Sequence, residues 1–305
     1  MRVAHISDIH LNTFFKNSNL KQIKFLLRYA LEQKFDHLVI TGDLVDNADQ
    51  KDFEILRSLF RKFNLLNSDR LSLVIGNHDI FGGAQTPEEI FTFQEKCRNV
   101  DYDRKVEEFS EYFSETFKGC VYRNKEKIFP YAKIIDDVLI AGVNSIARYS
   151  KVKNPFASNG VVEPEQLNEV KNIFNDFRNF CKYKLLLIHH QFNKIKISEG
   201  SPNSLWQIIE KQTMKLRKKK RLFSLFKQHG VDLVLHGHLH EQREYYRKGI
   251  RFLNAGASVK NNLYRKLFIN FIDLKSSKIK VSVHSISDFS REKIAEFNVP
   301  KLELI

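Results

Sequence analysis

The chain of 305 residues has few cysteines and no long apolar run. Cys97, Cys120 and Cys181 are widely spaced and form no Cys-x-x-Cys pair, which argues against a disulfide framework and against a zinc site built from thiolates. No stretch approaches the roughly 18 consecutive apolar residues that a membrane-spanning helix needs. The first residues also lack the apolar segment of a secretory signal. We therefore expect a protein of the reducing cytoplasm.

Basic residues outnumber acidic ones, with 50 Lys and Arg against 36 Asp and Glu and a formal net charge of +14. This excess favours anionic partners, because the summed field of a protein concentrates ions of opposite charge. AT-rich coding would also produce such a mixture of Lys, Asn, Ile and Phe, so part of the charge has a second explanation. The chain is 42% hydrophobic and 28% charged, which is ordinary for a globular protein and excludes collagen and coiled coils.

Apolar runs of strand length alternate with helical patterns along the chain. Strands are expected at 3–6, 37–41, 71–75, 138–143, 184–188 and 232–235, and helices at 20–32, 49–63, 105–117 and 164–183. Three further strands, expected to be antiparallel, follow at 252–253, 267–274 and 278–283. The alternation predicts βαβ units around a largely parallel core. We expect one domain over 1–305, with an insertion or cap at 80–127 and closing strands and a C-terminal tail at 250–305.

A polar cluster follows each of five expected core strands, at the edge where open α/β sheets place functional residues. The clusters are Ser7-Asp8-Ile9-His10, Gly42-Asp43-Leu44-Val45-Asp46, Gly76-Asn77-His78-Asp79, His189-His190 and His236-Gly237-His238-Leu239-His240. Each one alone has an ordinary explanation, since Gly-Asp is a common turn pair and Asn often begins a helix. Together they offer more ligands than one ion needs, and they predict a two-metal centre. If the chain stays extended, Asp8 and His10 point the same way, as do the two histidines of the last cluster.

The ordered set Asp-x-His, Gly-Asp-x-x-Asp, Gly-Asn-His-Asp, His and Gly-His-x-His resembles the calcineurin-like metallophosphoesterases. The resemblance implies an α/β fold, a four-layer αββα sandwich, in which a metal-bound hydroxide hydrolyses a phosphoester at one edge. It implies that Asp8, His10, Asp43 and His240 hold one metal, and that Asp43, Asn77, His189 and His238 hold the other. Asp43 would bridge the two ions, His78 would be the catalytic imidazole, and Asp46 and Asp79 would lie behind the ligands.

Two features of this centre follow from simple chemistry. Two divalent ions about 3.5–4 Å apart repel each other strongly, so they need an anionic bridge. Mixed carboxylate and imidazole ligands suit manganese, iron or zinc, of which we expect manganese to support activity best. Only one of the adjacent His189 and His190 should face the metals. The family pattern favours His189 and leaves His190 behind it, although Gln191 stands where many relatives have proline.

Two segments indicate which class of phosphoester the protein hydrolyses. Residues 141–145, which include Asn144, and residues 159–162 resemble the cyclic-nucleotide phosphodiesterase branch of the family. The predicted activity is therefore hydrolysis of a nucleotide-type phosphodiester, with Asn144 as a candidate substrate residue.

The basic run Lys215–Arg221, followed by the apolar residues of 222–226, leaves alternatives open. Its plainest interpretation is a solvated helix face. Residues 215–226 could also lie on an anionic membrane surface, as in a nucleotide-lipid pyrophosphatase peripheral to the membrane. The run could instead follow a nucleic-acid backbone, as in a DNA nuclease. A non-catalytic scaffold is the least favoured alternative, because no ligand position is lost.

Overall fold

A computed structural model describes residues 1–14, 17–84, 87–193, 214–259, 266–275 and 278–287, and in these residues two β-sheets lie face to face. The first sheet contains, in spatial order, β12 (Lys278–Ile286), β11 (Leu267–Lys275), β1 (Arg2–Ile6), β2 (His37–Thr41) and β3 (Leu71–Val74). The second contains β4 (Tyr122–Asn124), β5 (Ile128–Ile135), β6 (Val138–Gly142), β7 (Tyr183–Leu187), β8 (Leu233–His236), β10 (Ile250–Asn254) and β9 (Arg243–Arg247).

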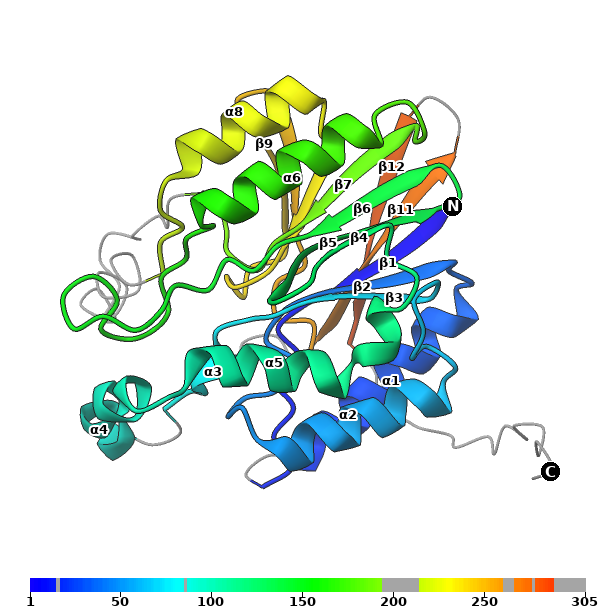
Figure 1. The fold of residues 1–305 in the computed structure, drawn as a ribbon. Helices are drawn as coiled ribbons and strands as arrows, with labels where there is room; N and C mark the ends of the chain where they lie inside the picture. Colours follow the sequence, from blue (N-terminus) through cyan, green and yellow to red (C-terminus); the bar gives the residue numbers. More distant parts are fainter. Residues whose placement is uncertain (15–16, 85–86, 194–213, 260–265, 276–277, 288–305) are drawn as a thin grey trace, which may run out of the picture.

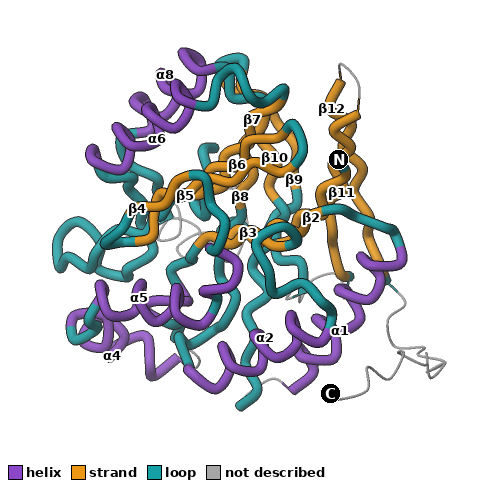
Figure 2. Tube along the Cα trace, turned by 45° about the vertical axis from the view of Figure 1, so that its right-hand side comes forward, coloured by secondary structure: helices purple, strands orange, loops and turns teal. Residues whose placement is uncertain are grey.

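Helices cover the outer faces of both sheets. The helices of the described residues are α1 (Asn17–Glu32), α2 (Gln50–Lys62), α3 (His78–Phe81), α4 (Pro87–Arg98), α5 (Tyr102–Tyr112), the 3₁₀ helix η1 (Ser114–Phe117), α6 (Pro164–Asp176) and α8 (Lys219–His229). Helices α1, α2 and α5 lie on the side of the first sheet, and α6 and α8 lie on the side of the second (Figure 1). Figure 2 shows the same layers from another side. The predicted four-layer αββα sandwich is confirmed.

The parallel strands in the middle of each sheet explain the continuous apolar runs of the sequence. Strands β1, β2 and β3 are parallel, as are β6, β7, β8 and β10. All residues of β2, β3, β6 and β8 are buried, because both faces of these strands are covered. The carboxyl ends of the two parallel sets point to the same side of the molecule (Figure 1). The polar clusters that follow these strands therefore meet at one edge.

Several expected elements differ in the structure. The helix expected at 105–117 ends at Tyr112, where η1 follows, and the helix expected at 164–183 ends at Asp176. The expectation that 252–253 runs antiparallel at the end of the domain was wrong, because β10 is parallel to β8 and antiparallel only to β9. An apolar run of this length does not reveal the direction of its partner strand. The expected C-terminal tail beyond residue 287 lies outside the described residues.

The stretch 80–127 contributes side chains to the core as well as a surface helix. On α5 the ring of Phe109 lies 6.1 Å from that of Phe53 on α2, and β4 forms one edge of the second sheet. In the described part of the chain, no helix combines the length and the apolar character needed to cross a membrane.

Two side chains of β5 connect the second sheet to the first. The Tyr131 hydroxyl donates a hydrogen bond to the carbonyl oxygen of Leu73 (2.9 Å), on β3. The Lys133 ammonium donates to the carbonyl oxygens of Leu71 (2.6 Å) and Ser68 (3.2 Å). Lys133 is only 1% exposed, and burial lowers its pKa to about 8. A buried cation held by neutral carbonyl groups costs folding free energy while it is charged.

Lys133 should therefore make stability depend on pH. The folded protein releases this proton near pH 8, whereas the unfolded chain keeps it up to about pH 10.5. The free energy of unfolding should thus rise by up to about 3 kcal/mol as the pH increases through this window. Lys133→Met should lack this rise, and urea unfolding at about pH 7.5 and about pH 10 measures it. The control is Lys125→Met, at an exposed position. A difference between wild type and Lys133→Met that stays constant with pH would contradict the burial argument.

Candidate metal centre

Several residues of the site have left-handed backbone conformations. Asp8 and His10 both have left-handed φ angles, of 52° and 43°, and Asp43 and His238 have φ angles of 51° and 72°. Such angles are disfavoured for residues other than glycine and collect at functional sites. The backbone N–H groups of Asp8 and His10 donate to the carbonyl oxygens of Gly42 (3.1 Å) and Asp43 (3.0 Å). The backbone at Asp8, His10 and His238 is therefore not extended, and the alignment that an extended chain would give these pairs does not apply.

Two glycines of the motifs allow backbone and carboxylate to approach closely. A Cβ atom on Gly76 would lie 2.1 Å from Asp43 Oδ1, and one on Gly237 would lie 2.2 Å from Asp8 Oδ2. A side chain at either position would displace a carboxylate of the site. This explains why glycine precedes Asn77 and His238.

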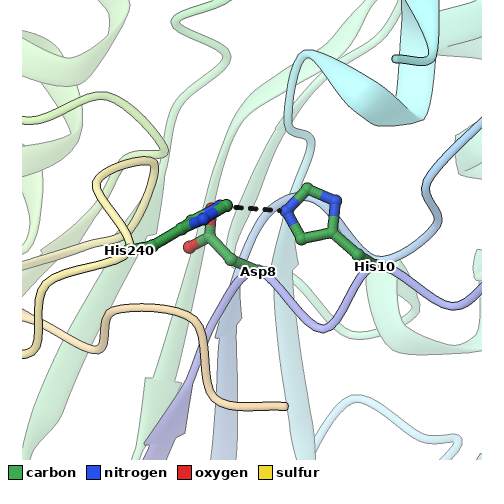
Figure 3. A group of neighbouring side chains, drawn as sticks. All are labelled: Asp8, His10 and His240. Atoms are coloured by element: carbon green, nitrogen blue, oxygen red, sulfur yellow. Dashed lines mark hydrogen bonds and ion pairs between the residues drawn. The ribbon is translucent and has the colours of Figure 1, made fainter. Parts of the chain in front are cut away.

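One group of possible ligands consists of Asp8, His10 and His240 (Figure 3). One side-chain atom from each residue lies within 4.8 Å of the others. The Nε2 atoms of His10 and His240 are 3.2 Å apart, and His240 Nε2 lies 3.8 Å from Asp8 Oδ1. Asp8 and His10 are fully buried, whereas the side chain of His240 is 47% exposed. This group is therefore open to solvent on the side of His240.

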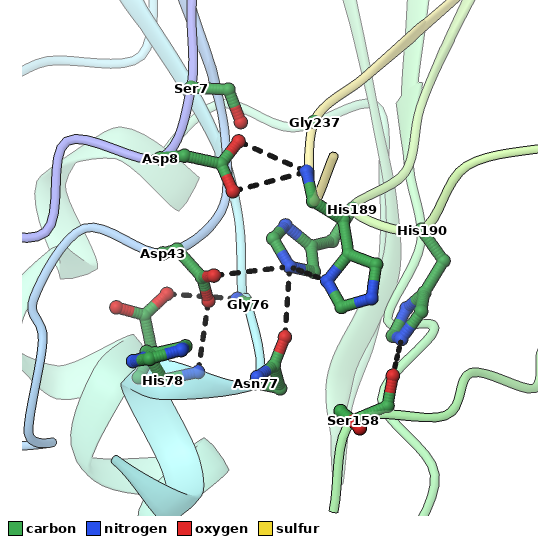
Figure 4. Close-up of polar contacts among 12 residues, drawn as sticks. Ser7, Asp8, Asp43, Gly76, Asn77, His78, Ser158, His189, His190 and Gly237 are labelled. Carbon is green, nitrogen blue, oxygen red and sulfur yellow. Dashed lines mark hydrogen bonds and ion pairs between the residues drawn. The ribbon is translucent and has the colours of Figure 1, made fainter. Parts of the chain in front are cut away.

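A second group consists of Asp43, His189 and His238. Figure 4 shows Asp43 and His189 of this group, with Asn77 beside them. His189 Nε2 lies 3.4 Å from Asp43 Oδ2, 3.1 Å from Asn77 Oδ1 and 3.0 Å from His238 Nδ1. The other ring nitrogen of His189, Nδ1, lies 2.8 Å from the carbonyl oxygen of Thr41, so it carries a hydrogen and donates it there. This contact orients the ring and turns Nε2 toward the centre of the group.

Asp43 connects the two groups. Its Oδ1 accepts a hydrogen bond from the backbone N–H of His78 (2.9 Å). Its Oδ2 lies 3.7 Å from His10 Nε2 in the first group and 3.4 Å from His189 Nε2 in the second. One oxygen atom thus faces both sets of nitrogen atoms, which is the position of a bridging ligand.

The buried carboxylates of Asp8 and Asp43 need a nearby positive charge. Burial, reinforced by Asp43 and partly offset by His189, raises the pKa of Asp8 to about 7. Burial also acts to raise the pKa of Asp43, but the surrounding imidazoles outweigh it and hold that pKa well below its usual value. For His189, burial opposes the charged form, yet the two carboxylates raise its pKa to about 9. In the protein alone, a proton on His189 supplies the positive charge that buried carboxylates require, and a metal ion would displace that proton. The residues present therefore fit a metal centre.

The adjacent histidines point in different directions (Figure 4). The ring of His190 is fully buried, with Nδ1 2.8 Å from the Ser145 hydroxyl and Nε2 3.2 Å from the Ser158 carbonyl oxygen. Burial and the neighbouring His189 lower the pKa of His190 to about 3. Both nitrogens of His190 are thus engaged by protein groups, and only His189 enters the ligand group.

His78 lies beside the first group and is positioned by Asp46. Its Nδ1 lies 3.0 Å from the carbonyl oxygen of Asp46 and 3.3 Å from its Oδ1. Asp46 Oδ1 also lies 3.2 Å from Nδ1 of His10, and the rings of His10 and His78 are 4.5 Å apart. Burial acts to lower the pKa of His78, but the carboxylates of Asp43 and Asp46 outweigh it and raise that pKa. The side chain of His78 is 24% exposed, so it can meet a molecule at the opening.

The remaining predicted residues lie outside the ligand groups. Asp79 accepts hydrogen bonds from the backbone N–H groups of Gly76 (2.8 Å) and Val45 (3.0 Å), and so ties two ligand-bearing loops together. The Nδ2 atom of Asn144 donates to the Tyr102 hydroxyl (2.9 Å), and its Oδ1 atom accepts from the backbone N–H of Ile146 (2.8 Å). The side chains of Asn144 and Tyr102 line a cavity of about 680 Å³ between α5 and α6.

Two contributors were missed by the sequence analysis. The carbonyl oxygen of Thr41 orients His189, and the Asn12 amide donates to Asp46 Oδ2 (3.3 Å). Asn12 lies only two residues after His10, so its nearness to the motif was the available signal. A backbone carbonyl such as that of Thr41 leaves no signal in the sequence.

The chain is similar to known proteins in both sequence and structure. The sequence model for the calcineurin-like phosphoesterases matches residues 1–242. A search of curated proteins found no match. Among solved structures, the chain resembles a dimetal phosphatase from Danio rerio, with a TM-score of 0.60 and 8% identity over 94% of this chain and 98% of that one. It also resembles a purple acid phosphatase from seeds of yellow lupin, Lupinus luteus, with a TM-score of 0.57 and 13% identity over 94% of this chain and 52% of that one. Identities this low show a shared fold, and the sequence match shows the family. The chain therefore belongs to the calcineurin-like phosphoesterase family, the hydrolases of phosphoric esters.

Proposed function

We propose that this chain is a metal-dependent phosphodiesterase that acts on a nucleotide-type phosphodiester at a dinuclear centre. The proposed ligands are Asp8, His10, Asp43 and His240 for one ion, and Asp43, Asn77, His189 and His238 for the other. The observation that carries the proposal is the position of Asp43 Oδ2 between the two groups. When bound, two divalent cations would supply Lewis-acid chemistry, polarising a phosphoryl oxygen and making water more acidic. The ligand types suit manganese, iron or zinc, and we propose manganese as the most effective ion.

His78 is the proposed proton donor. Because its Nδ1 faces two oxygen atoms of Asp46, that nitrogen keeps its hydrogen and the ring cannot turn freely. In the protonated ring, Nε2 then carries the second hydrogen. From there His78 can donate to a phosphoryl oxygen or to the leaving alkoxide, where negative charge develops.

The preference for a phosphodiester rests on the two segments that resemble the cyclic-nucleotide branch. In the structure they lie side by side: Val161 N–H donates to the carbonyl oxygen of Ser145 (2.9 Å), and Ala147 N–H donates to that of Asn159 (3.1 Å). The Ser145 hydroxyl in turn lies 2.8 Å from His190 Nδ1, directly behind the ligand His189. These segments are largely buried and pack behind the ligand group through His190, so the resemblance itself is what supports the diester preference.

The structure gives less support to a lipid substrate and to a non-catalytic scaffold. A membrane-bound nucleotide-lipid pyrophosphatase would need apolar side chains of 215–226 at the surface. Leu222, Phe223, Leu225 and Phe226 are instead between 0% and 8% exposed, packed in the core. A scaffold without catalysis would not need two complete ligand groups.

Metal content should distinguish the adjacent histidines. His189→Ala removes a nitrogen from the second group, so it should lower the bound manganese from about two ions per chain to about one or fewer. His190→Ala removes a ring held by two serines and should leave about two ions bound, at a cost in stability of about 1–3 kcal/mol. Elemental analysis of dialysed protein, with circular dichroism to verify folding, makes the comparison. Loss of metal from His190→Ala but not from His189→Ala would contradict the assignment.

Kinetics should separate metal binding from proton donation. His78→Asn should reduce kcat on bis-p-nitrophenyl phosphate with manganese by about 10²–10⁴-fold while the metal content stays unchanged. Asp43→Ala should lose both activity and metal. The control is His284→Asn, on β12, where the imidazole contacts Tyr29 (2.6 Å) far from the centre. Wild-type kcat/KM should be higher on this diester than on the monoester p-nitrophenyl phosphate. The reverse order would contradict the diester preference, and unchanged activity of His78→Asn would contradict its role.

A further inference from the structure

One short stretch carries a net charge equal to half that of the whole protein. Residues 214–229 contain seven Lys or Arg and no Asp or Glu, against a net charge of +14 for the whole chain. The proposed chemistry at the metal centre makes no use of these cations. Their concentration in 16 residues also exceeds what a general bias toward basic codons would place there.

This stretch begins next to the metal centre. Gly160 N–H donates to the carbonyl oxygen of Lys215 (2.9 Å), and Arg217 N–H donates to that of Gly160 (2.8 Å). Gly160 in turn packs on His190, since a Cβ atom there would lie 2.5 Å from the His190 ring. The following helix, α8, starts on the side of the molecule to which the carboxyl ends of β6 and β7 point (Figure 1). The cations thus extend outward from the edge that holds the ligands.

Most cations of this stretch face solvent, and the apolar residues of α8 face the core. Lys215, Lys218, Lys220 and Arg221 are exposed, and none of them forms an ion pair with a residue that the structure describes. The first turn of α8 contains no acidic residue, so its cations also oppose the helix dipole. This arrangement lowers the stability of the helix, so a contribution to folding does not explain it.

The β9–β10 hairpin adds further positive charge to the same surface. The Arg247 guanidinium and the Lys248 ammonium lie 5.4 Å and 5.2 Å from the centre of the Phe223 ring on α8. Arg247 and Lys219 both donate hydrogen bonds to the carbonyl oxygen of Phe192, three residues after the ligand His189. Cations from two distant parts of the chain are therefore held side by side.

We propose that this cationic surface, formed by Lys215, Arg217, Lys218, Lys220, Arg221 and Lys248, binds the phosphate backbone of a nucleic acid. A row of exposed cations suits a polyanion, because backbone phosphates are bound through charge. A membrane is disfavoured, since the apolar residues of α8 are buried and cannot insert. Binding is independent of the proposed function, whereas placing a phosphodiester of the strand at the metals rests on it.

The test is the binding of a fluorescent oligothymidylate in EDTA, followed by anisotropy at several salt concentrations. The variant Lys215→Gln/Lys220→Gln/Arg221→Gln removes three cations from the cationic surface. The control Lys21→Gln/Lys24→Gln/Lys62→Gln removes three exposed lysines from α1 and α2, on the opposite side of the molecule (Figure 1). The surface variant should bind at least about ten-fold more weakly, with the slope of log K against log salt reduced by about 2. The control should bind like the wild type.

Three outcomes would overturn the proposal. They are no binding by the wild type, equal weakening in both variants, and binding to phosphatidylglycerol vesicles that the oligonucleotide does not compete away. Hydrolysis of bis-p-nitrophenyl phosphate separates this proposal from the proposed function, because the surface variant should keep wild-type kcat on this small substrate. A wild type that binds the oligonucleotide but hydrolyses nothing would refute the proposed function alone. One that hydrolyses the diester but binds no oligonucleotide would refute the cationic surface alone.

Discussion

The geometry of the site depends on a single carboxylate, that of Asp43. One of its oxygens is fixed by the backbone N–H of His78, which leaves the other between His10 and His189. A buried carboxylate in this position is stable only beside positive charge, whether protons on imidazoles or metal ions. The left-handed backbone of Asp43 and the missing side chain of Gly76 both serve to bring this group to its place. The strained backbone of Asp43 and the glycine at position 76 therefore both follow from the need to hold this carboxylate beside positive charge.

The two sheets must hold their relative position for the centre to exist. Asp8, His10, Asp43 and Asn77 follow strands of the first sheet, whereas His189, His238 and His240 follow strands of the second. Contacts between β5 and β3, through Tyr131 and Lys133, join the sheets away from the centre. The cost of burying Lys133 indicates that a polar connection between the sheets is retained at the expense of some stability. The chemistry of the site thus depends on the packing between the two sheets.

Much of this could be predicted from the sequence, and the parts that could not have physical reasons. Buried parallel strands leave continuous apolar runs, so the strand ends and the polar clusters after them were visible. The path of the backbone at Asp8 was not, because a left-handed residue is selected by contacts with the next loop. The roles of the adjacent histidines depended on Ser145 and Ser158, which are distant in sequence. The apolar residues of 222–226 would show the same helical pattern on a membrane or in a core, and only the structure places them in the core.

The central claim, that Asp43 bridges two metal ions, can be tested by anomalous diffraction from crystals grown with manganese. Two anomalous peaks are expected about 3.5–4 Å apart, on either side of Asp43 Oδ2. One peak should lie beside His10 and His240, and the other beside His189 and His238. A single peak, or a second peak bound by His190, would contradict the account.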